Sequence, residues 1–464
     1  MTEKIEKALG IPWIQISLLA VITLVAFVLR FYKLGDWSFW YDESYTMRDV
    51  RNMLQLSLLD QQVSRSLIYL VVNTLGTSEF NARLVPALIG VISIPILFFP
   101  IRQMLGAGVA LLFSLFLALN PWHLYWSQNA RFYTALLLFY TLALLVFYFG
   151  IEKDKPWYMV LFLVLLGLAV QERLFAVFLV PVVAAYLLIL RFLPFEKPAG
   201  LRWRNVLILV IPSLLIGLLY SLEFIRDPQK WLTGFSWVNN NPFWILSGVV
   251  FYVGLPVMCM GATAAIVMLV KKNRAVLLLA LAAVFPLVAL MMLSLFQYTA
   301  NRYAFVSLTS WLILAALGVW LLFTQSKGLG WVLAVGAILI LVLEPVSEAY
   351  LYYRYQNGNR DNWKAAFTLV NRLKEPGDQI VVTNTQLGDY YTGGPTQNYF
   401  RFDTQNLPTD GSRIWFIEDN NLGEKTADKL RWVEANSELI ANYDVHVRAR
   451  NFKMRVYLLD PETQ

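Results

Sequence analysis

Long segments with almost no charge recur along the sequence, and they constrain its fold more than any other feature. The stretches "WIQISLLAVITLVAFVL" (13–29) and "AVLLLALAAVFPLVALMMLSLF" (275–296) are each long enough to cross the roughly 30 Å hydrocarbon core of a bilayer as a helix. Of the 464 residues, 58% are hydrophobic and 15% are charged, a combination that is rare in soluble domains. The sequence therefore predicts a polytopic α-helical membrane protein.

About eleven membrane-spanning helices are predicted. The N-terminal tail and every second connection, such as "GIEKDKPW" and "KKNR", carry most of the Lys and Arg of the short loops. The positive-inside rule makes these parts cytoplasmic, so the first loop and everything after about residue 350 are external. The predicted spans are 11–30, 83–101, 107–121, 131–149, 156–173, 174–192, 203–222, 243–270, 275–296, 302–324 and 329–350.

The first external loop, about 33–82, contains the apolar stretch "RSLIYLVVNTLG" (65–76). This stretch is too short to span a bilayer, and counting it as a span would place the basic loops on the wrong side. We interpret it as a helix that lies against the outer surface.

Residues 351–464 differ in composition from the rest, because charge rises and the apolar runs shorten to strand length. "NWKAAFTLVNRLK" has apolar residues at helical spacing, with Asp361 as its expected N-cap, and "TADKLRWVEANSEL" is a second amphipathic pattern. The runs "QIVVTN", "RIWFIED", "YDVHVRAR" and "KMRVYLLD" are typical of strands. This part is predicted to be a small external α/β domain that follows the membrane domain 1–350.

Polar residues gather at the external junctions of the spans, where ionisable groups are candidates for function. They are Asp42 and Glu43 in "WYDESY", His123, Gln128, Asn129 and Arg131, then Glu172 and Arg173, and finally Arg302. The set fits group transfer to a hydroxyl, in which a carboxylate takes the proton and Arg binds a leaving phosphate. Each residue also has a structural alternative: the acids can cap a loop helix, the arginines can anchor at headgroups, and His123 can be an interfacial hydrogen-bonding residue.

Several of these motifs resemble a known family. "WYDESYT" in a first external loop resembles the acidic motif of the GT-C membrane glycosyltransferases, in the protein-O-mannosyltransferase and aminoarabinose-transferase-like branch (glycosyltransferase family 39). "FNARLVPALIG", "NPWHLYWSQNARFY", "NRYAFVSLTSW" and "RDNWKAAFTLVNRLKEPGDQIVV" are similar to later blocks, in the same order along nearly the whole chain. The resemblance implies a GT-C fold and the inverting transfer of one hexose or pentose from a polyprenyl-phosphate donor to an acceptor hydroxyl on the external, periplasmic face.

The resemblance also implies roles for single residues. Asp42 corresponds to the catalytic base and Glu43 to its companion acid. Arg131, Tyr133 and Arg302 match positions expected near the lipid phosphate or the sugar. The other predicted donor-binding residues, which do not rest on that match, are Tyr303, Glu172 and Arg173. The residues expected on the acceptor side or along the cavity are Tyr41, Tyr45, His123, Gln128 and Asn129.

Two positions depart from the family pattern. Many relatives carry His-Pro-Pro where this chain has "VSRSLIY", and many carry Glu where this chain has Asn129. The missing carboxylate weakens any metal site, makes Glu172 a candidate second acid and leaves open a diverged specificity. We expect no cofactor, since two histidines and one cysteine do not favour a His/Cys metal site; carboxylate-bound Mg²⁺ or Mn²⁺ is an alternative that is not favoured.

The expected partners are a polyprenyl-phosphate-linked sugar, a lipid, glycan or protein acceptor, and the bilayer of a plasma (inner) membrane, with no nucleic acid. One rival function is a transporter or lipid flippase, but such proteins usually place ionisable residues near the bilayer midplane, often in repeated halves. The other rival is an inactive scaffold subunit with the same fold.

Overall fold

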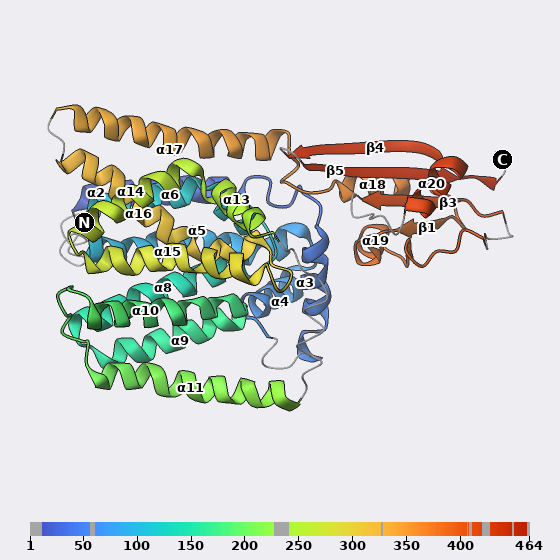
Figure 1. Cartoon of the computed structure of the whole chain (residues 1–464). Helices are drawn as coiled ribbons and strands as arrows, with labels where there is room; N and C mark the ends of the chain where they lie inside the picture. Colours follow the sequence, from blue (N-terminus) through green and yellow to red (C-terminus); the bar gives the residue numbers. More distant parts are fainter. Residues whose placement is uncertain are drawn as a thin grey trace.

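The computed structural model describes residues 12–55, 61–226, 241–325, 328–405, 407, 411–419, 427–447 and 450–461. Its long helices lie side by side in a bundle, and a small sheet domain stands at one end of that bundle (Figure 1). Two short helices of the first loop, α3 (Tyr41–Arg51) and α4 (Val63–Leu75), lie at the same end. The helix that carries Asp42 and Glu43 therefore lies where the bundle meets the sheet domain.

Each predicted span coincides with helix in the described part of the chain. By length and apolar composition, seven of the described helices are able to cross a membrane, or up to nine if each bent pair is one span. The bounds of these segments are α2 (Trp13–Phe31), α5 (Glu79–Leu105), α6 and α7 (Ala107–Leu119, Pro121–Ser127), α8 (Tyr133–Lys153), η2 and α10 (Leu174–Phe178, Leu179–Phe192), α13 and α14 (Pro242–Val253, Leu255–Val270), α15 (Arg274–Leu293), η4 and α16 (Asn301–Ser307, Leu308–Gln325) and α17 (Leu329–Arg354).

Two further predicted spans fall on helices that are not counted among these. These are α9 (Pro156–Glu172) and α11 (Trp203–Arg226), of which Pro156–Glu172 and Trp203–Leu214 are shorter apolar stretches. The prediction of a multi-span helical protein is confirmed, and the eleven predicted segments match the helices found.

Two spans are broken, and both breaks have a local cause. α6 and α7 meet at 59°, where Pro121 lacks the backbone N–H that would continue a helix and the Asn120 side chain accepts from the N–H of His123. α13 and α14 meet at 94° around Gly254, whose φ of 94° suits a residue without a Cβ. Such breaks are tolerated in a membrane where the freed backbone lines a cavity or is covered by protein.

The apolar stretch 65–76 is helical, as predicted, within α4. α4 packs against α3, α5 and α9 rather than crossing the bundle. The N-terminus of α4 is capped by Glu172, the last residue of α9. The Glu172 carboxylate accepts from the backbone N–H and from the hydroxyl of Ser64.

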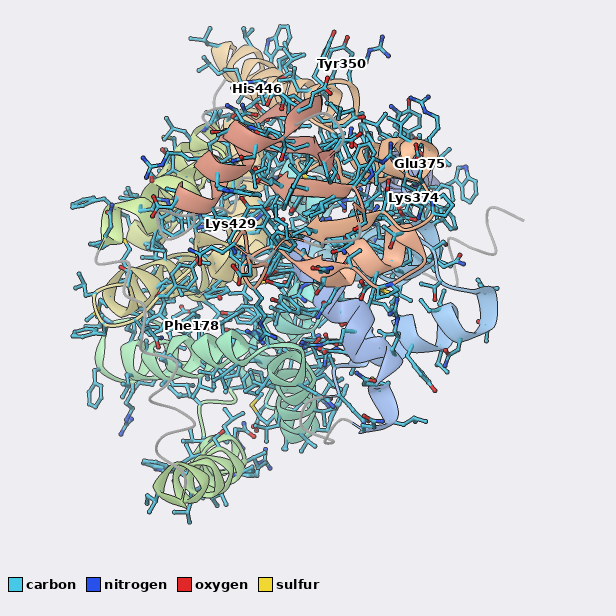
Figure 2. All side chains as sticks on the ribbon, turned by 90° about the vertical axis from the view of Figure 1, so that its right-hand side faces the viewer. Phe178, Tyr350, Lys374, Glu375, Lys429 and His446 are labelled. Carbon is cyan, nitrogen blue, oxygen red and sulfur yellow. The ribbon has the colours of Figure 1, made fainter. Side chains whose placement is uncertain are left out.

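The C-terminal part is a five-stranded mixed sheet with helices, as predicted. Its elements are α18 (Trp363–Leu373), β1 (Gln379–Val382), α19 (Thr385–Thr392), β2 (Gln397–Asn398), β3 (Ile414–Asp419), α20 (Ala427–Asn436), β4 (Glu438–Val447) and β5 (Arg450–Leu459). The order is β2-β1-β3-β5-β4; β1 pairs in parallel with β2 and β3, and β5 pairs antiparallel with β3 and β4. Figure 2 shows this domain end-on, with Lys374, Glu375, Lys429 and His446 on it.

The N-cap of α18 is Asn362 and not Asp361 as predicted. The Asn362 side chain accepts from the N–H of Ala365, whereas the backbone carbonyl of Asp361 accepts from the hydroxyl of Ser38 in the first loop. Asp361, just before α18, thus binds the sheet domain to the first loop.

A shared hydrophobic core joins the sheet domain to the first loop. Phe39 and Met47 of the loop pack with Trp363, Phe367 and Trp415 of the sheet domain in one cluster of buried side chains. This burial is the main attraction between the two parts. α17 ends at Arg354, so the predicted boundary at residue 350 falls inside this helix, about one turn before its end.

Candidate functional site

The first turn of α3 presents two adjacent carboxylates in different directions. α3 begins at Tyr41, so Asp42 and Glu43 are its second and third residues, and successive helical residues point about 100° apart. Negative charge is favourable at a helix N-terminus. The backbone N–H of Trp40 donates to Oε2 of Glu43 (3.3 Å), which fixes the start of the helix.

Glu43 points inward and is fully buried. Its carboxylate receives a two-pronged contact from Arg83 (Nε to Oε1, 2.8 Å; Nη2 to Oε2, 2.7 Å), one from Arg360 Nη1 (3.1 Å) and one from the N–H of Ala130 (2.7 Å). Burial alone would raise the pKa of Glu43, but the two guanidinium groups and this N–H hold the pKa below its ordinary value. A carboxylate whose oxygens are all engaged positions the loop and does not exchange protons with a substrate.

Asp42 points to the other side and stays partly exposed. Its Oδ2 lies 3.6 Å from Nη2 of Arg302 and 3.8 Å from Nη2 of Arg131. Arg131 is itself held, because its Nη1 donates to the backbone carbonyl of Asp42 (3.0 Å) and to the hydroxyl of Thr46 (2.9 Å). Both ion pairs are too long for direct hydrogen bonds, so the Asp42 carboxylate can accept from a further group.

These three residues come from separate parts of the chain. Asp42 lies on α3, Arg131 on the turn before α8, and Arg302 at the start of η4. The sequence predicted that polar residues at separate external junctions lie close together. In the structure the Asp42 carboxylate lies between the guanidinium groups of Arg131 and Arg302.

A cavity of about 600 Å³ reaches this cluster. Arg302 and Trp40 are on its wall, and the wall is otherwise rich in aromatic rings. It runs past the broken helices α6–α7 and α13–α14, past α17, and up to the β4–β5 hairpin of the sheet domain. The aromatic lining residues are Trp40, Phe116, Trp122, Tyr125, Trp126, Trp244, Phe251, Tyr252, Tyr298 and Phe452.

Further members of the predicted donor set lie around the same cluster. Phe132 is flanked by the guanidinium groups of Arg131 (5.2 Å to the ring centroid) and Arg173 (5.6 Å). The ring of Tyr303 lies 5.9 Å from the guanidinium of Arg302 and stacks on Phe175 at 4.1 Å. Tyr133 is buried and stacks on Trp126, a cavity residue, at 3.7 Å.

Four other predicted site residues bind groups inside the protein. Glu172 caps α4, and Nδ1 of His123 lies 2.7 Å from Nη2 of Arg30. The Gln128 amide donates to the Tyr32 carbonyl (2.8 Å) and its oxygen accepts from the Tyr352 hydroxyl (2.9 Å), while Asn129 donates to the Tyr125 carbonyl. All four are buried and none lines the cavity, because each satisfies backbone or side-chain groups at a helix break or helix end.

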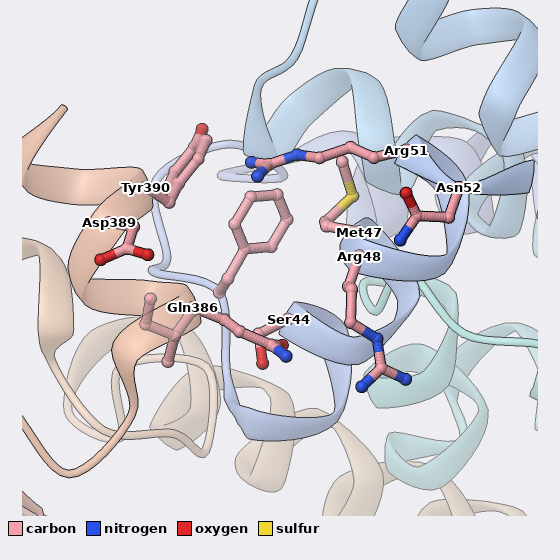
Figure 3. Close-up of a pocket in the computed structure, with 10 residues that line it drawn as sticks. Ser44, Met47, Arg48, Arg51, Asn52, Gln386, Asp389 and Tyr390 are labelled. Carbon is pink, nitrogen blue, oxygen red and sulfur yellow. The ribbon is translucent and has the colours of Figure 1, made fainter. Parts of the chain in front are cut away.

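Tyr41 and Tyr45 also lie outside the cavity lining. They are one helical turn apart on α3, and their hydroxyls are 3.0 Å from each other. On the side of α3 opposite Asp42, a second cavity of about 210 Å³ lies between Ser44, Met47, Arg48 and Arg51 of this helix and α19 (Figure 3). At about 3.6 residues per turn these positions face away from Asp42.

Sequence reasoning missed two residues that organise the site, Arg83 and Arg360. Both side chains are almost completely buried and both bind Glu43. Arg83 had a signal, namely a charge near the start of an apolar span. Arg360 had none, because an arginine in a polar connecting segment looks like an exposed one. Among the described residues no group of three or more His, Cys, Asp or Glu could hold a metal ion.

Comparison with known proteins supports the fold. Residues 63–216 match the model of the family described as dolichyl-phosphate-mannose-protein mannosyltransferase, a match that begins after Asp42 and Glu43. No curated protein sequence matches the chain significantly.

Solved structures match over most of the chain. The structure of ArnT from Cupriavidus metallidurans bound to undecaprenyl phosphate matches with a TM-score of 0.62 and 15% identity, over 95% of this chain and 97% of that one. The oligosaccharyltransferase AglB from Archaeoglobus fulgidus, in complex with an inhibitory peptide and a dolichol-phosphate, matches with a TM-score of 0.55 and 13% identity, over 88% of this chain and 69% of that one. The GT-C resemblance and fold class expected from the motifs are thereby confirmed.

Proposed function

We propose that this chain, which has the fold of the GT-C membrane glycosyltransferases, transfers one sugar from a polyprenyl-phosphate-linked donor to an acceptor hydroxyl. The observation that carries the proposal is the position of Asp42, a partly exposed carboxylate between Arg131 and Arg302, of which Arg302 lines the aromatic-rich cavity. The aromatic residues of the cavity wall suit the apolar carrier next to its phosphate, and Arg302 on that wall, with Arg131 nearby, suits the phosphate itself.

In the proposed reaction Asp42 acts on the acceptor, and Arg131 and Arg302 act on the leaving phosphate. The acceptor oxygen attacks the anomeric carbon while Asp42 takes its proton, and the bond from that carbon to the phosphate oxygen breaks. The polyprenyl phosphate leaves with the bonding electrons, and Arg131 and Arg302 stabilise the charge that develops on it. Attack from the face opposite the leaving phosphate inverts the anomeric configuration. The solved structures that hold undecaprenyl phosphate and dolichol-phosphate support a lipid-linked donor.

A turnover assay tests the function. Purified protein is given polyprenyl-phosphate-linked sugars labelled in the sugar, together with lipid, glycan or peptide acceptors. A transferase releases free polyprenyl phosphate and moves the label to an acceptor. A flippase moves the intact donor between leaflets of a vesicle, and an inactive scaffold does neither, so either result would replace the proposal.

We expect Arg131→Ala and Arg302→Ala each to weaken donor binding or slow transfer by about tenfold or more. Losing a hydrogen bond to a charged group costs about 1.5–3 kcal/mol, and 1.4 kcal/mol corresponds to a factor of ten. The measurement is steady-state kinetics at varied donor concentration. Arg48→Ala is the control, since Arg48 lies on α3, the helix of Asp42, but pairs with Asp49 and not with Asp42. Unchanged donor kinetics in both site variants would leave these arginines as headgroup anchors.

The proposed orientation places the N-terminus and the basic loops in the cytoplasm and the sheet domain outside. In a Cys259→Ser background, Lys374→Cys should react with a membrane-impermeant thiol reagent in whole cells, and Lys155→Cys should not. Both side chains are exposed, Lys374 after α18 of the sheet domain and Lys155 just before α9. The opposite labelling pattern would invert the orientation. Ser326, in another predicted cytoplasmic loop, lies outside the described residues.

A further inference from the structure

A tight left-handed turn leads from α17 into the sheet domain. Asn357, Gly358 and Asn359 all have positive φ (45°, 63° and 58°), a conformation that glycine and asparagine adopt most easily. A Cβ on Gly358 would lie 2.8 Å from the ring of Trp37, so this position has room for glycine alone. The turn reverses the chain beneath the first loop, and the next residue is Arg360.

Arg360 is buried between the first loop and the turn that precedes α8. Its Nη1 donates to Oε2 of Glu43 (3.1 Å) and approaches the carbonyl of Ser38 (3.5 Å), while Nη2 points to the carbonyl of Gln128 (3.4 Å). Its Nε donates back to the carbonyl of Gly358 (3.1 Å). The planar guanidinium therefore links the sheet domain to both segments that carry the reacting cluster.

Glu43 lies at the centre of that linkage. It is the neighbour of Asp42 in the chain, and its Oε1 accepts from the N–H of Ala130, the neighbour of Arg131. The Glu43 carboxylate thus joins the backbone next to Asp42 to the backbone next to Arg131, beside the direct contacts of Arg131 with the Asp42 carbonyl and the Thr46 hydroxyl. Arg83 holds it from α5 and Arg360 holds it from the sheet domain.

We infer that Arg360 is a positioning residue through which the docked sheet domain sets the catalytic geometry of Asp42 and Arg131. The inference rests on the proposed function of these two residues. It ties the docking of the sheet domain to the geometry of the site, because without Arg360 one of the two cations on Glu43 is missing.

The test compares Arg360→Gln with Lys364→Gln. Lys364 pairs with Glu79 across the same junction (3.5 Å) but is partly exposed and does not contact Glu43. In Arg360→Gln we expect kcat to fall about 10- to 100-fold with the donor KM within about twofold of wild type, since small displacements of reacting groups have effects of this size. In Lys364→Gln both constants should stay near wild type. Arg360→Lys, which keeps the charge but not the fork, should lie between.

Several results would overturn the inference. An unchanged kcat in Arg360→Gln would refute the inference. A fall in kcat of the same size in Lys364→Gln would show that any weakening of the junction between the sheet domain and the first loop lowers kcat, without a specific role for Arg360. Because Arg360 also lies on the cavity wall, a raised donor KM with unchanged kcat would make it a substrate contact instead. Arg83 keeps Glu43 paired, so the variant should fold; if it does not, Arg360→Lys carries the same comparison.

A second readout separates this inference from the proposed function. Hydrogen exchange of peptides covering residues 39–52, followed by mass spectrometry, should be about tenfold faster for α3 in Arg360→Gln than in wild type or Lys364→Gln. A wild-type protein that transfers no sugar refutes the proposed function, yet exchange still reports whether Arg360 restrains α3. Identical exchange in all three proteins would refute the positioning role even if the enzyme is active.

Discussion

Asp42→Asn should lower the turnover number by about 10²–10⁴-fold, the usual contribution of a general base. The amide has nearly the same shape but cannot take the proton of the acceptor hydroxyl. Donor affinity should change little, because Arg131 and Arg302 carry the phosphate contacts in the proposed mechanism. The measurement is turnover at saturating donor and acceptor, together with a direct donor-binding assay.

A matched control for this variant lies on the same helix. Asp49→Asn removes another carboxylate of α3, one that pairs with Arg48 and Arg65 rather than with the reacting cluster. It should keep near-normal turnover. If Asp42→Asn does so as well, the base is a different group, and Asp361 becomes the first candidate because it lies on the cavity wall and burial, with the nearby charge of Asp419, raises its pKa to about 7. Glu172, the alternative suggested by the sequence, is instead committed to capping α4.

Glu43→Gln should destabilise the folded protein by about 3–5 kcal/mol, the usual effect of removing one partner from a buried ion pair. The substitution leaves the guanidinium groups of Arg83 and Arg360 buried without a counter-charge. The expected observation is a lower midpoint of thermal unfolding in detergent and less folded protein after purification. Asp42→Asn, which changes a partly exposed group, should leave the midpoint nearly unchanged.

Two additional measurements sharpen the Glu43 prediction. The double variant Glu43→Gln/Arg360→Gln should be less unstable than the sum of the single variants, because it removes one of the unpaired cations. The pKa of Glu43 is held below its ordinary value of 4.5, so its contribution to stability is complete above that pH and is lost as the pH falls through the lower folded value. A midpoint of Glu43→Gln equal to that of wild type would show that these contacts do not hold the loop.

Much of the architecture was predictable because it depends on local properties. A long apolar segment reports a span wherever it lies in the chain, and alternating or helical spacing reports the strands and helices of the sheet domain. α19 was missed because eight residues with few apolar positions give little periodicity. The cap of α18 was assigned to Asp361 because Asp361 and Asn362 are both suitable cap residues, and only the docking of Asp361 on Ser38 separates them.

The candidate site was predictable in part. Asp42, Arg131 and Arg302 were expected to meet, since they lie at external junctions that a bundle brings to one end. Four other residues lie at similar junctions but bind groups inside the protein. They are His123, Gln128, Asn129 and Glu172. Both groups are polar residues at the ends of predicted spans, so the direction of each side chain had to come from the structure.

The sequence by itself determined that this chain is a multi-span helical membrane protein with a C-terminal α/β unit and an acidic pair at the end of the bundle. It did so because hydropathy and periodicity act over neighbouring residues. Only the tertiary structure decided that Glu43 is locked between Arg83 and Arg360 while Asp42 stays accessible between Arg131 and Arg302. The two acids are adjacent and chemically alike, and their difference arises from cations that distant segments bring to one side of α3 or the other.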